Sequence, residues 1–370
     1  MHLIETGGPG GAETIFAELA GSLDLGGLRP LAVVSKEGWL SKRLRDGGIQ
    51  PVILAPGSPM SLRYVWKLVN AVRRHHTRLI VSHLAGASTY AAIVGLVTRT
   101  PIVAILHGPT DLRYAGRLAT FRRWLWSSTY FAIVAVSSST RDAMVAYGIP
   151  EKSITLIRNG VDTEVYAPGR TNDFRTELGL TSEDLLVGAV GNIRVPKAYD
   201  ILINAAHLVC QTRRNCHFVI VGDGDKAALK SLEALQRSFH LDDRCHFVGF
   251  RQTSADLYRN FDVFVSSSSS EGLSLAFLEA MACGLPVVAT CSGGPQEVID
   301  QDKSGLLVPV GDPSALAAAL NRVLESRQLR ARLGDAGRTR IVDAFSRTSM
   351  LREYSALCEA VRSGVAGVSG

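Results

Sequence analysis

The chain has 370 residues, of which 46% are hydrophobic and 20% are charged, so it can bury the cores of two or more domains, and disordered or fibrous proteins are excluded. Its six cysteines form no C-x-x-C pair and all lie in the second half, which predicts buried packing residues of a reducing compartment rather than a zinc site or a disulfide framework. Residues 1–168 hold 18 Lys and Arg against 11 Asp and Glu, a net charge of +7, whereas residues 169–370 hold 22 against 23, or −1. The basic half favours phosphorylated substrates or anionic lipid over nucleic acid, because its arginines are not interleaved with a recognisable nucleic-acid module.

The first residues, MHLIETGG, contain neither a basic nor an apolar stretch, so we expect no secretion signal and a cytoplasmic protein. The longest uncharged run, residues 79–98, divides into a strand-like LIVS and a helix-like AGASTYAAIVGLVT. It therefore does not predict a membrane span.

Short β-branched segments alternate with longer segments of helical period, which predicts parallel sheets built from β–α–β units. The candidate strands of the first half are residues 2–4, 31–35, 51–54, 79–82, 101–106, 131–136 and 153–157. After a polar stretch, those of the second half are residues 185–191, 217–222, 245–250, 262–266, 286–290 and 305–309, followed only by helical patterns. We predict an α/β protein with an N-terminal domain at 1–165, a linker at 166–184, a second domain at 185–343 and a C-terminal helical segment at 344–370.

Ligands of open parallel sheets bind beyond the carboxyl ends of the strands, so loops that follow candidate strands are the candidate sites. In residues 5–14, Gly10 and Gly11 precede a helix that begins near Ala12, where backbone N–H groups can approach an anion. The alternative is a flexible turn, since the G-x-G-x-x-G pattern is incomplete. His107 follows the strand at 101–106 and can donate to a hydroxyl or phosphate oxygen; a purely structural histidine is the alternative.

Two further loops follow strands of the second half. Arg194 and Lys197 can converge on one phosphate group, although a solvated basic turn is the alternative. The most specific motif is residues 270–288, where Glu271 and the segment Gly272, Leu273 and Ser274 precede a helix from about Leu275, and Glu279 lies eight residues after the first Glu. Ionised carboxylates accept hydrogen bonds from vicinal hydroxyls, and a helix N-terminus suits a diphosphate. The combination indicates a nucleotide sugar.

The segment 221–227, VGDGDKA, resembles a dinucleotide fingerprint and also a D-x-D metal clamp. No acidic residue ends the following strand, which argues against a nicotinamide cofactor. Asp223 and Asp225 are interpreted as turn residues, because Arg194 and Lys197 can neutralise phosphates instead. We therefore expect no metal and no cofactor apart from the donor substrate.

The motifs GGAE, HG at 107–108, NGVD at 159–162, the Arg and Lys after residue 191, and E-x7-E occur in the order found in the retaining glycosyltransferases of family 4, which this chain resembles over nearly its whole length. The resemblance implies the GT-B fold, with two Rossmann-like domains facing across a cleft and a C-terminal helix that returns to the first domain. The sequence departs from the family pattern G-R-L-x-x-x-K-G at two positions, because Asn192 and Ala198 replace the Arg and the second Gly of the pattern.

The resemblance also implies residue roles. The catalytic positions are His107 and Glu271, and both contact the donor sugar. By the same resemblance, Arg194 and Lys197 bind the donor diphosphate and Glu279 binds the ribose. From their loops we also expect Gly10 and Gly11 at the diphosphate, and Gly272, Leu273 and Ser274 at the donor sugar. The expected reaction moves a hexosyl group, with retention and without a metal, from a UDP- or GDP-sugar to a glycan or lipid-linked acceptor in polysaccharide or glycoconjugate synthesis. A nucleotide-sugar epimerase and a binding module without turnover are the alternatives.

A basic and aromatic segment near residue 120 bears on the acceptor. Its arginines are Arg113, Arg117, Arg122 and Arg123, and its aromatic residues are Phe121, Trp124 and Trp126. At helical spacing this gives a basic side and an aromatic edge, which predicts peripheral contact with the anionic inner face of the cell membrane. The alternative is an ordinary core-packed helix with its arginines in water.

Overall fold

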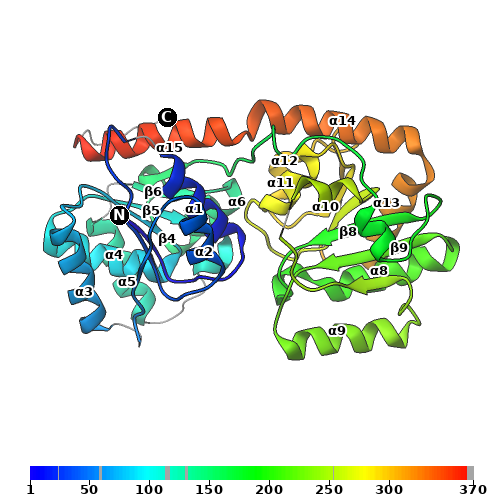
Figure 1. Cartoon of the computed structure of the whole chain (residues 1–370), viewed down its shortest axis with the longest axis horizontal. Helices are drawn as coiled ribbons and strands as arrows, with labels where there is room; N and C mark the ends of the chain where they lie inside the picture. Colours follow the sequence, from blue (N-terminus) through cyan, green and yellow to red (C-terminus); the bar gives the residue numbers. More distant parts are fainter. Residues whose placement is uncertain (24, 58–60, 113–116, 130–131, 253, 365–370) are drawn as a thin grey trace. The chain divides into compact units, whose positions relative to one another are not determined.

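The structure is a computed structural model that describes the chain apart from residues 24, 58–60, 113–116, 130–131, 253 and 365–370. By its internal contacts the chain divides into two units (Figure 1). The first unit comprises Met1–Asn159 with Thr348–Gly370, and the second comprises Gly160–Arg347. The expected return of the C-terminal helix to the first unit is therefore confirmed.

Within the described residues, the first unit contains a seven-stranded parallel sheet of order β3-β2-β1-β4-β5-β6-β7. Its strands are β1 (His2–Ile4), β2 (Ala32–Val34), β3 (Val52–Ile53), β4 (Ile80–His83), β5 (Ile102–Leu106), β6 (Ala132–Ala135) and β7 (Ile154–Leu156). Its helices are α1 (Gly11–Ser22), α2 (Trp39–Asp46), α3 (Leu62–Arg74), α4 (Ala85–Thr98), η1 (Pro109–Leu112), α5 (Arg117–Thr129), α6 (Ser138–Tyr147), η2 (Glu151–Ser153) and α15 (Arg347–Arg362).

The second unit contains, in its described part, a six-stranded parallel sheet of order β10-β9-β8-β11-β12-β13. Its strands are β8 (Leu185–Val190), β9 (Cys216–Val221), β10 (Cys245–Phe247), β11 (Val263–Ser266), β12 (Val287–Thr290) and β13 (Leu306–Val308). Its helices are α7 (Asp173–Glu177), η3 (Val195–Lys197), α8 (Tyr199–Thr212), α9 (Lys226–Ser238), α10 (Ala255–Arg259), α11 (Leu275–Ala282), α12 (Pro295–Val298), α13 (Pro313–Glu325) and α14 (Arg327–Ala344).

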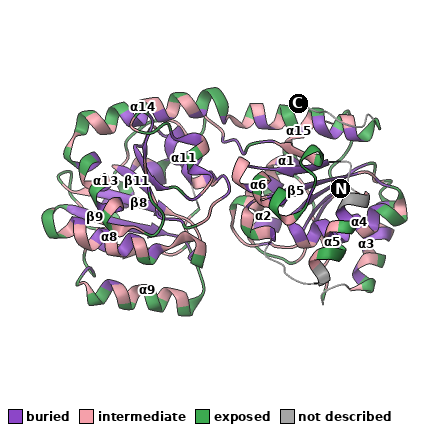
Figure 2. Cartoon of the chain, turned by 180° about the vertical axis from the view of Figure 1, so that it is seen from behind, coloured by how far each residue is buried: buried purple, intermediate pink, exposed green. Residues whose placement is uncertain are grey.

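Each predicted strand coincides with an observed one to within a few residues, so the α/β fold class is confirmed. The inner strands of both sheets are mostly buried (Figure 2), whereas the edge strands β3 and β7 are only half-buried. Inner parallel strands are covered by helices on both faces and therefore need apolar side chains on both. Such strands appear in a sequence as short continuous apolar runs.

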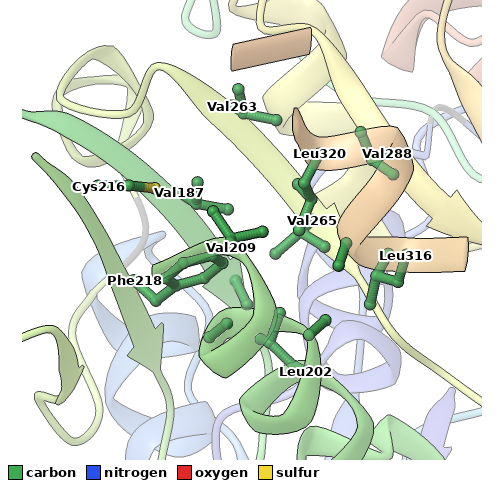
Figure 3. Close-up of a cluster of buried hydrophobic side chains, with 14 of the residues drawn as sticks. Val187, Leu202, Val209, Cys216, Phe218, Val263, Val265, Val288, Leu316 and Leu320 are labelled. Carbon is green, nitrogen blue, oxygen red and sulfur yellow. The ribbon is translucent and has the colours of Figure 1, made fainter. Parts of the chain in front are cut away.

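The core of the second unit shows how helices cover one face of a sheet. Leu202 from α8 and Leu316 from α13 pack with Val187 and Val265 of the sheet (Figure 3), and all four side chains are at most 1% exposed. Each such side chain contributes about 1.5–3 kcal/mol through its burial. Helix α13 begins where Asp312 accepts a hydrogen bond from the backbone N–H of Ala315 at 2.9 Å.

Residues 166–184, expected to form a linker, are packed into the second unit. Arg175 of α7 has a side chain only 2% exposed, and it forms an ion pair with Asp262 at 3.0 Å. Its guanidinium also donates to the carbonyl oxygen of Asn260 at 3.0 Å. This network holds the segment against the amino end of β11, within the second unit, which begins at Gly160.

Helix α15 completes the first unit with an apolar stripe. Its buried side chains recur at helical spacing and are Met350, Tyr354, Leu357, Cys358 and Val361. Figure 2 shows this helix buried along one side and exposed along the other, as expected for an amphipathic helix that packs on a domain.

Candidate functional site

The two central strands of the second sheet, β8 and β11, are adjacent, although they are not consecutive in the chain. From β8 the strand order runs outward one way through β9 to β10, and from β11 it runs the other way to β13. Loops at such a reversal diverge beyond the carboxyl ends of the strands, which is where ligands of doubly wound sheets bind. The loops after β8 and β11 carry the two most specific sequence motifs of this half.

The predicted residues Lys197 and Glu271 meet at this position. Lys197 Nζ donates to Glu271 Oε2 at 2.7 Å, and their side chains are 15% and 18% exposed. Ser268 Oγ donates to the same carboxylate oxygen at 3.0 Å. A cation and a carboxylate held together at a strand-end loop offer one group for phosphate oxygens and one for sugar hydroxyls.

Hydrogen bonds to backbone carbonyl oxygens hold these two loops together. Ser267 Oγ donates to the carbonyl oxygen of Lys197 at 2.9 Å, and the N–H of Ser269 donates to the carbonyl oxygen of Pro196 at 2.8 Å. Ala198, which ends η3, has φ +46°. This is the left-handed region that favours glycine, which gives a physical reason for the glycine that the family pattern has here.

Glu271 is anchored through its backbone. Its N–H donates to the carbonyl oxygen of Ser292 at 2.8 Å, and its carbonyl oxygen accepts from the N–H of Gly294 at 3.1 Å. A Cβ on Gly294 would collide with the carbonyl oxygen of Gly272, so this close approach of two backbones requires glycine. The loop that carries Glu271 is thereby fixed to the loop after β12.

Helix α11 begins at Leu275, as predicted. Ser274 is its N-cap residue, but its hydroxyl makes no capping hydrogen bond. A hollow of about 10 Å³, the space of about one water, is lined by Lys197, Ser268 and Ser274 among others. The start of the helix and Lys197 therefore border the same small space.

Glu279, the expected ribose ligand, lies in α11 and is only 6% exposed. Its Oε2 accepts a hydrogen bond of 2.5 Å from the hydroxyl of Tyr258. Burial, together with the adjacent Glu279 carboxylate, raises the pKa of Tyr258 well above its ordinary value. The tyrosine therefore stays protonated and donates to the carboxylate.

Arg194 is exposed, as expected for a phosphate ligand and equally for a solvated turn. Asp223 Oδ1 accepts from the N–H of Phe250 at 3.0 Å. Asp225 Oδ1 accepts from Ala227 at 2.8 Å and caps α9. These backbone hydrogen bonds support the interpretation of both aspartates as turn and cap residues.

In the first unit, His107 follows β5 as predicted. Its backbone N–H donates to Asp111 Oδ2 at 2.7 Å, and its Nε2 lies 3.1 Å from Nδ1 of His83. Burial lowers the pKa of His107 to about 3. The ring is therefore neutral near pH 7 and can donate one hydrogen bond and accept another.

Helix α1 begins at Gly11, with Gly10 as its N-cap and no side-chain cap, close to the predicted start at Ala12. The carboxylate of Glu13 lies over Gly10, in the space that a Cβ would fill. A negative charge thus already lies beside the N–H groups of this helix N-terminus. A diphosphate at Gly10 and Gly11 would require Glu13 to turn away.

The predicted basic side of α5 is wrong at Arg122. That side chain is 6% exposed, and its guanidinium carbon lies 5.8 Å from the ring centroid of the buried Trp126. Arg123 donates to the carbonyl oxygen of Tyr147 at 3.3 Å, and the side chains of Arg113 and Arg117 lie outside the described residues. Phe121 and Trp124 are 39% and 62% exposed. The expected aromatic edge is therefore exposed to solvent, whereas Arg122 is not.

The cysteines also differ from expectation at two positions. Four of them are buried, but Cys210 is half-buried and Cys291 is exposed.

Among the described residues, no helix is both long and apolar enough to cross a membrane.

Sequence reasoning missed three residues at these sites: Ser268, Tyr258 and His83. Ser268 belongs to the serine run 266–270 directly after β11, and that position was the available signal. Tyr258 and His83 contact their partners across 21 and 24 residues, which no local pattern indicates.

Comparison with known proteins identifies relatives of both halves. Residues 9–165 match the family model described as Glycosyltransferase Family 4, and residues 171–340 match the model described as Glycosyl transferases group 1. The N-acetyl-alpha-D-glucosaminyl L-malate synthase of Bacillus anthracis is 26% identical over 305 residues, which cover 81% of this chain and 79% of that protein. A D-inositol 3-phosphate glycosyltransferase of Geodermatophilus obscurus is 32% identical over 240 residues, which cover 61% of this chain and about half, 52%, of the relative.

A solved structure has the same fold. The Alr3699/HepE protein of Anabaena, crystallised in complex with UDP-glucose, aligns with a TM-score of 0.86 at 24% identity, covering 98% of this chain and 100% of that one. At this identity the likeness concerns the fold.

Proposed function

The chain belongs to the glycosyltransferases of the family 4 type, and from that premise we propose that it transfers a hexosyl group from a UDP- or GDP-sugar to a glycan or lipid-linked acceptor, with retention of anomeric configuration. The observation that carries the proposal is the contact between Lys197 and Glu271 at the strand-order reversal of the second sheet. That the Anabaena structure was solved with UDP-glucose is consistent with such a donor.

In this proposal the diphosphate replaces Glu271 as the partner of Lys197. The ammonium group turns to the phosphate oxygens, and the exposed Arg194 adds a second cation from the same loop. The N-terminus of α11, which lacks a side-chain cap, supplies backbone N–H groups. These groups together would neutralise a departing nucleoside diphosphate.

The carboxylates take the hydroxyl-bearing ends of the donor. Glu271, released from Lys197, accepts from hydroxyls of the hexose, with Gly272, Leu273 and Ser274 beside it. Glu279 keeps the Tyr258 hydroxyl on Oε2 and offers its remaining acceptor capacity to the ribose. The roles of Gly10, Gly11 and His107 toward the donor stay predictions.

The proposed chemistry breaks the bond between the anomeric carbon and the diphosphate oxygen and forms one to the acceptor oxygen on the same face. The acceptor proton passes to the leaving phosphate. Catalysis is then mainly electrostatic, through groups aimed at the developing negative charge. Because these groups are cationic side chains and N–H donors, we expect turnover to survive chelation with EDTA. Loss of activity that Mg²⁺ or Mn²⁺ restores would contradict this and favour a metal role for Asp223 and Asp225.

One experiment separates the proposal from its alternatives. The protein is first screened against UDP- and GDP-sugars by thermal shift, since a ligand that binds the folded state raises its stability. The stabilising donor is then incubated with candidate acceptors. Hexose transfer supports the proposal, an isomerised sugar indicates an epimerase, and binding without any product indicates a binding module.

We propose a lipid-linked acceptor, and the aromatic edge of α5 is the observation that supports it. The rings of Phe121 and Trp124 are exposed, with centroids 6.2 Å apart, and such side chains enter the interfacial layer of a membrane. Sedimentation with anionic vesicles tests this, using Trp124→Ser. Unchanged partitioning of that variant would leave a soluble acceptor as the better proposal.

A further inference from the structure

The residue that contacts His107 lies at the strand-order reversal of the first sheet. His83 is the last residue of β4, it is 0% exposed, and it pairs in register with Ile4 of β1 and Ile105 of β5. Ile105 is the register partner of His83, so their side chains lie on the same face of the sheet. Side chains two residues apart on a strand also share a face, and His107 therefore lies on the same side as His83. The two imidazole rings therefore stack, with centroids 5.3 Å apart and an interplanar angle of 15°.

The contact between the rings is a hydrogen bond between two neutral groups. Burial lowers the pKa of His83 well below its ordinary value, and it lowers the pKa of His107 to about 3. A neutral imidazole carries one proton, so across the 3.1 Å from His83 Nδ1 to His107 Nε2 one ring donates and the other accepts.

The surroundings of His83 decide which ring donates. Phe16 and His2 pack around it, with ring centroids 5.1 and 6.4 Å away. Within the described part of the chain, its buried Nε2 has no hydrogen-bond partner. A buried N–H without a partner is rarer in proteins than an unsatisfied acceptor. Either assignment leaves one ring with an unmade N–H, at Nε2 of His83 or at Nδ1 of His107. His83 is completely buried, whereas His107 is half-buried in the loop after β5, so only the N–H of His107 can be satisfied by a ligand. The proton of His83 is therefore placed on Nδ1, and its Nε2 is the bare acceptor.

We propose that His83 is a positioning residue: its Nδ1–H donates to Nε2 of His107 and so fixes the proton of His107 on Nδ1, from which His107 donates to a hydroxyl of the sugar substrate. This rests on the proposed function in that His107 binds the sugar. In the described residues, Nδ1 of His107 is buried without a partner. A substrate oxygen that accepts from it removes the cost of an unmade hydrogen bond.

Three variants test the role. His83→Leu keeps apolar bulk but removes the donor, and His83→Asn returns an amide N–H near the position of Nδ1. His2→Leu is the matched control, because it removes another buried imidazole from the same cluster and leaves the His83–His107 contact in place. For each, ¹⁵N spectra of histidine-labelled protein report which ring nitrogen of His107 is protonated, and donor kinetics report kcat and KM separately.

We expect His83→Leu to shift the His107 signals toward the other tautomer and to lower kcat roughly tenfold with little change in donor KM. His83→Asn should restore much of both, and His2→Leu should alter neither. An unchanged His107 tautomer in His83→Leu, or equal kinetic losses in the Leu and Asn variants, overturns the proposal. If the unaltered protein turns over no nucleotide sugar, the proposed function fails, whereas the spectra still decide the role of His83.

Discussion

Replacing Lys197 by alanine gives the sharpest test of the donor site, because the structure predicts different effects on stability and on catalysis. The ion pair with Glu271 is mostly buried, with side chains 15% and 18% exposed, so its loss costs more than the about 0–1 kcal/mol of a fully exposed pair. Glu271 also keeps its hydrogen bond from Ser268 at 3.0 Å. The variant should therefore remain folded but unfold at a moderately lower denaturant concentration than the unaltered protein.

The catalytic loss should be much larger. A charged group that stabilises the departing diphosphate contributes on the order of 3 kcal/mol in the transition state, which corresponds to ~100-fold in rate. Transfer measured at subsaturating donor gives kcat/KM, in which this loss should appear. Lys230→Ala, on the exposed surface of α9, is the control and should keep full activity.

The partner variant sharpens the test. Glu271→Ala should also lose most transfer, because the hexose loses an acceptor. It should nevertheless bind UDP or GDP at least as tightly as the unaltered protein, since Lys197 no longer has to leave its carboxylate partner. Lys197→Ala should bind the same nucleotide more weakly, and calorimetry measures both. Full activity in both variants, or weakened nucleotide binding in Glu271→Ala equal to that in Lys197→Ala, would refute the site assignment.

Three further variants test other features of the structure. Burial lowers the pKa of His2 and of His107 to about 3, so below pH 6.5 the unfolded chain binds more protons than the folded protein. The free energy of unfolding, measured with urea, should be greatest above pH 6.5 and should fall as the pH decreases, by up to about 1.4 kcal/mol per pH unit for each histidine. In His2→Leu this fall should be less steep. Ala198→Gly should raise the free energy of unfolding by roughly 0.5–1 kcal/mol, because φ is +46° there, when measured by urea denaturation. Cys291→Ser should remove the fastest reaction with a chromogenic thiol reagent, because Cys291 is exposed, whereas burial raises the pKa of Cys245 and Cys283 to about 12 and slows their reaction.

Each of these has a clear contrary result. A pH-independent stability between pH 7 and 5 would mean that the buried histidines are protonated in the folded state. A less stable Ala198→Gly variant would mean that the turn after η3 is not strained in solution. A fast thiol reaction that persists without Cys291 would identify a different accessible cysteine.

The strands could be predicted because their signal is local. Runs such as residues 101–106 and 131–136 are apolar on both faces and bounded by turn residues. One short segment therefore suffices to predict a strand that is buried on both faces of the sheet. The Glu271 loop was also predictable, since its spacing and glycine lie within one stretch of chain. The signals for the confirmed strands and for this loop both come from residues that are neighbours in sequence.

The remaining features depend on distant partners. Arg122 was expected in solvent with the other arginines of its segment, but the fold places it against Trp126, and the direction a helix faces is set by packing. Tyr258 meets Glu279 only because α10 and α11 lie together, and His83 meets His107 only through the register of β4 and β5. Sequence patterns gave the elements and their loops, whereas these contacts required the sheet.

The division of the first unit into two chain segments has a consequence for synthesis. Its last helix, with the fully buried Tyr354 and Cys358, follows the whole of the second unit in the chain. On a ribosome, residues 160–347 therefore emerge and can begin to fold while the first unit still lacks the helix that covers part of its core. Until α15 arrives, the apolar surface that it will cover is open to chaperones, and a chain cut short before residue 348 would expose that surface permanently.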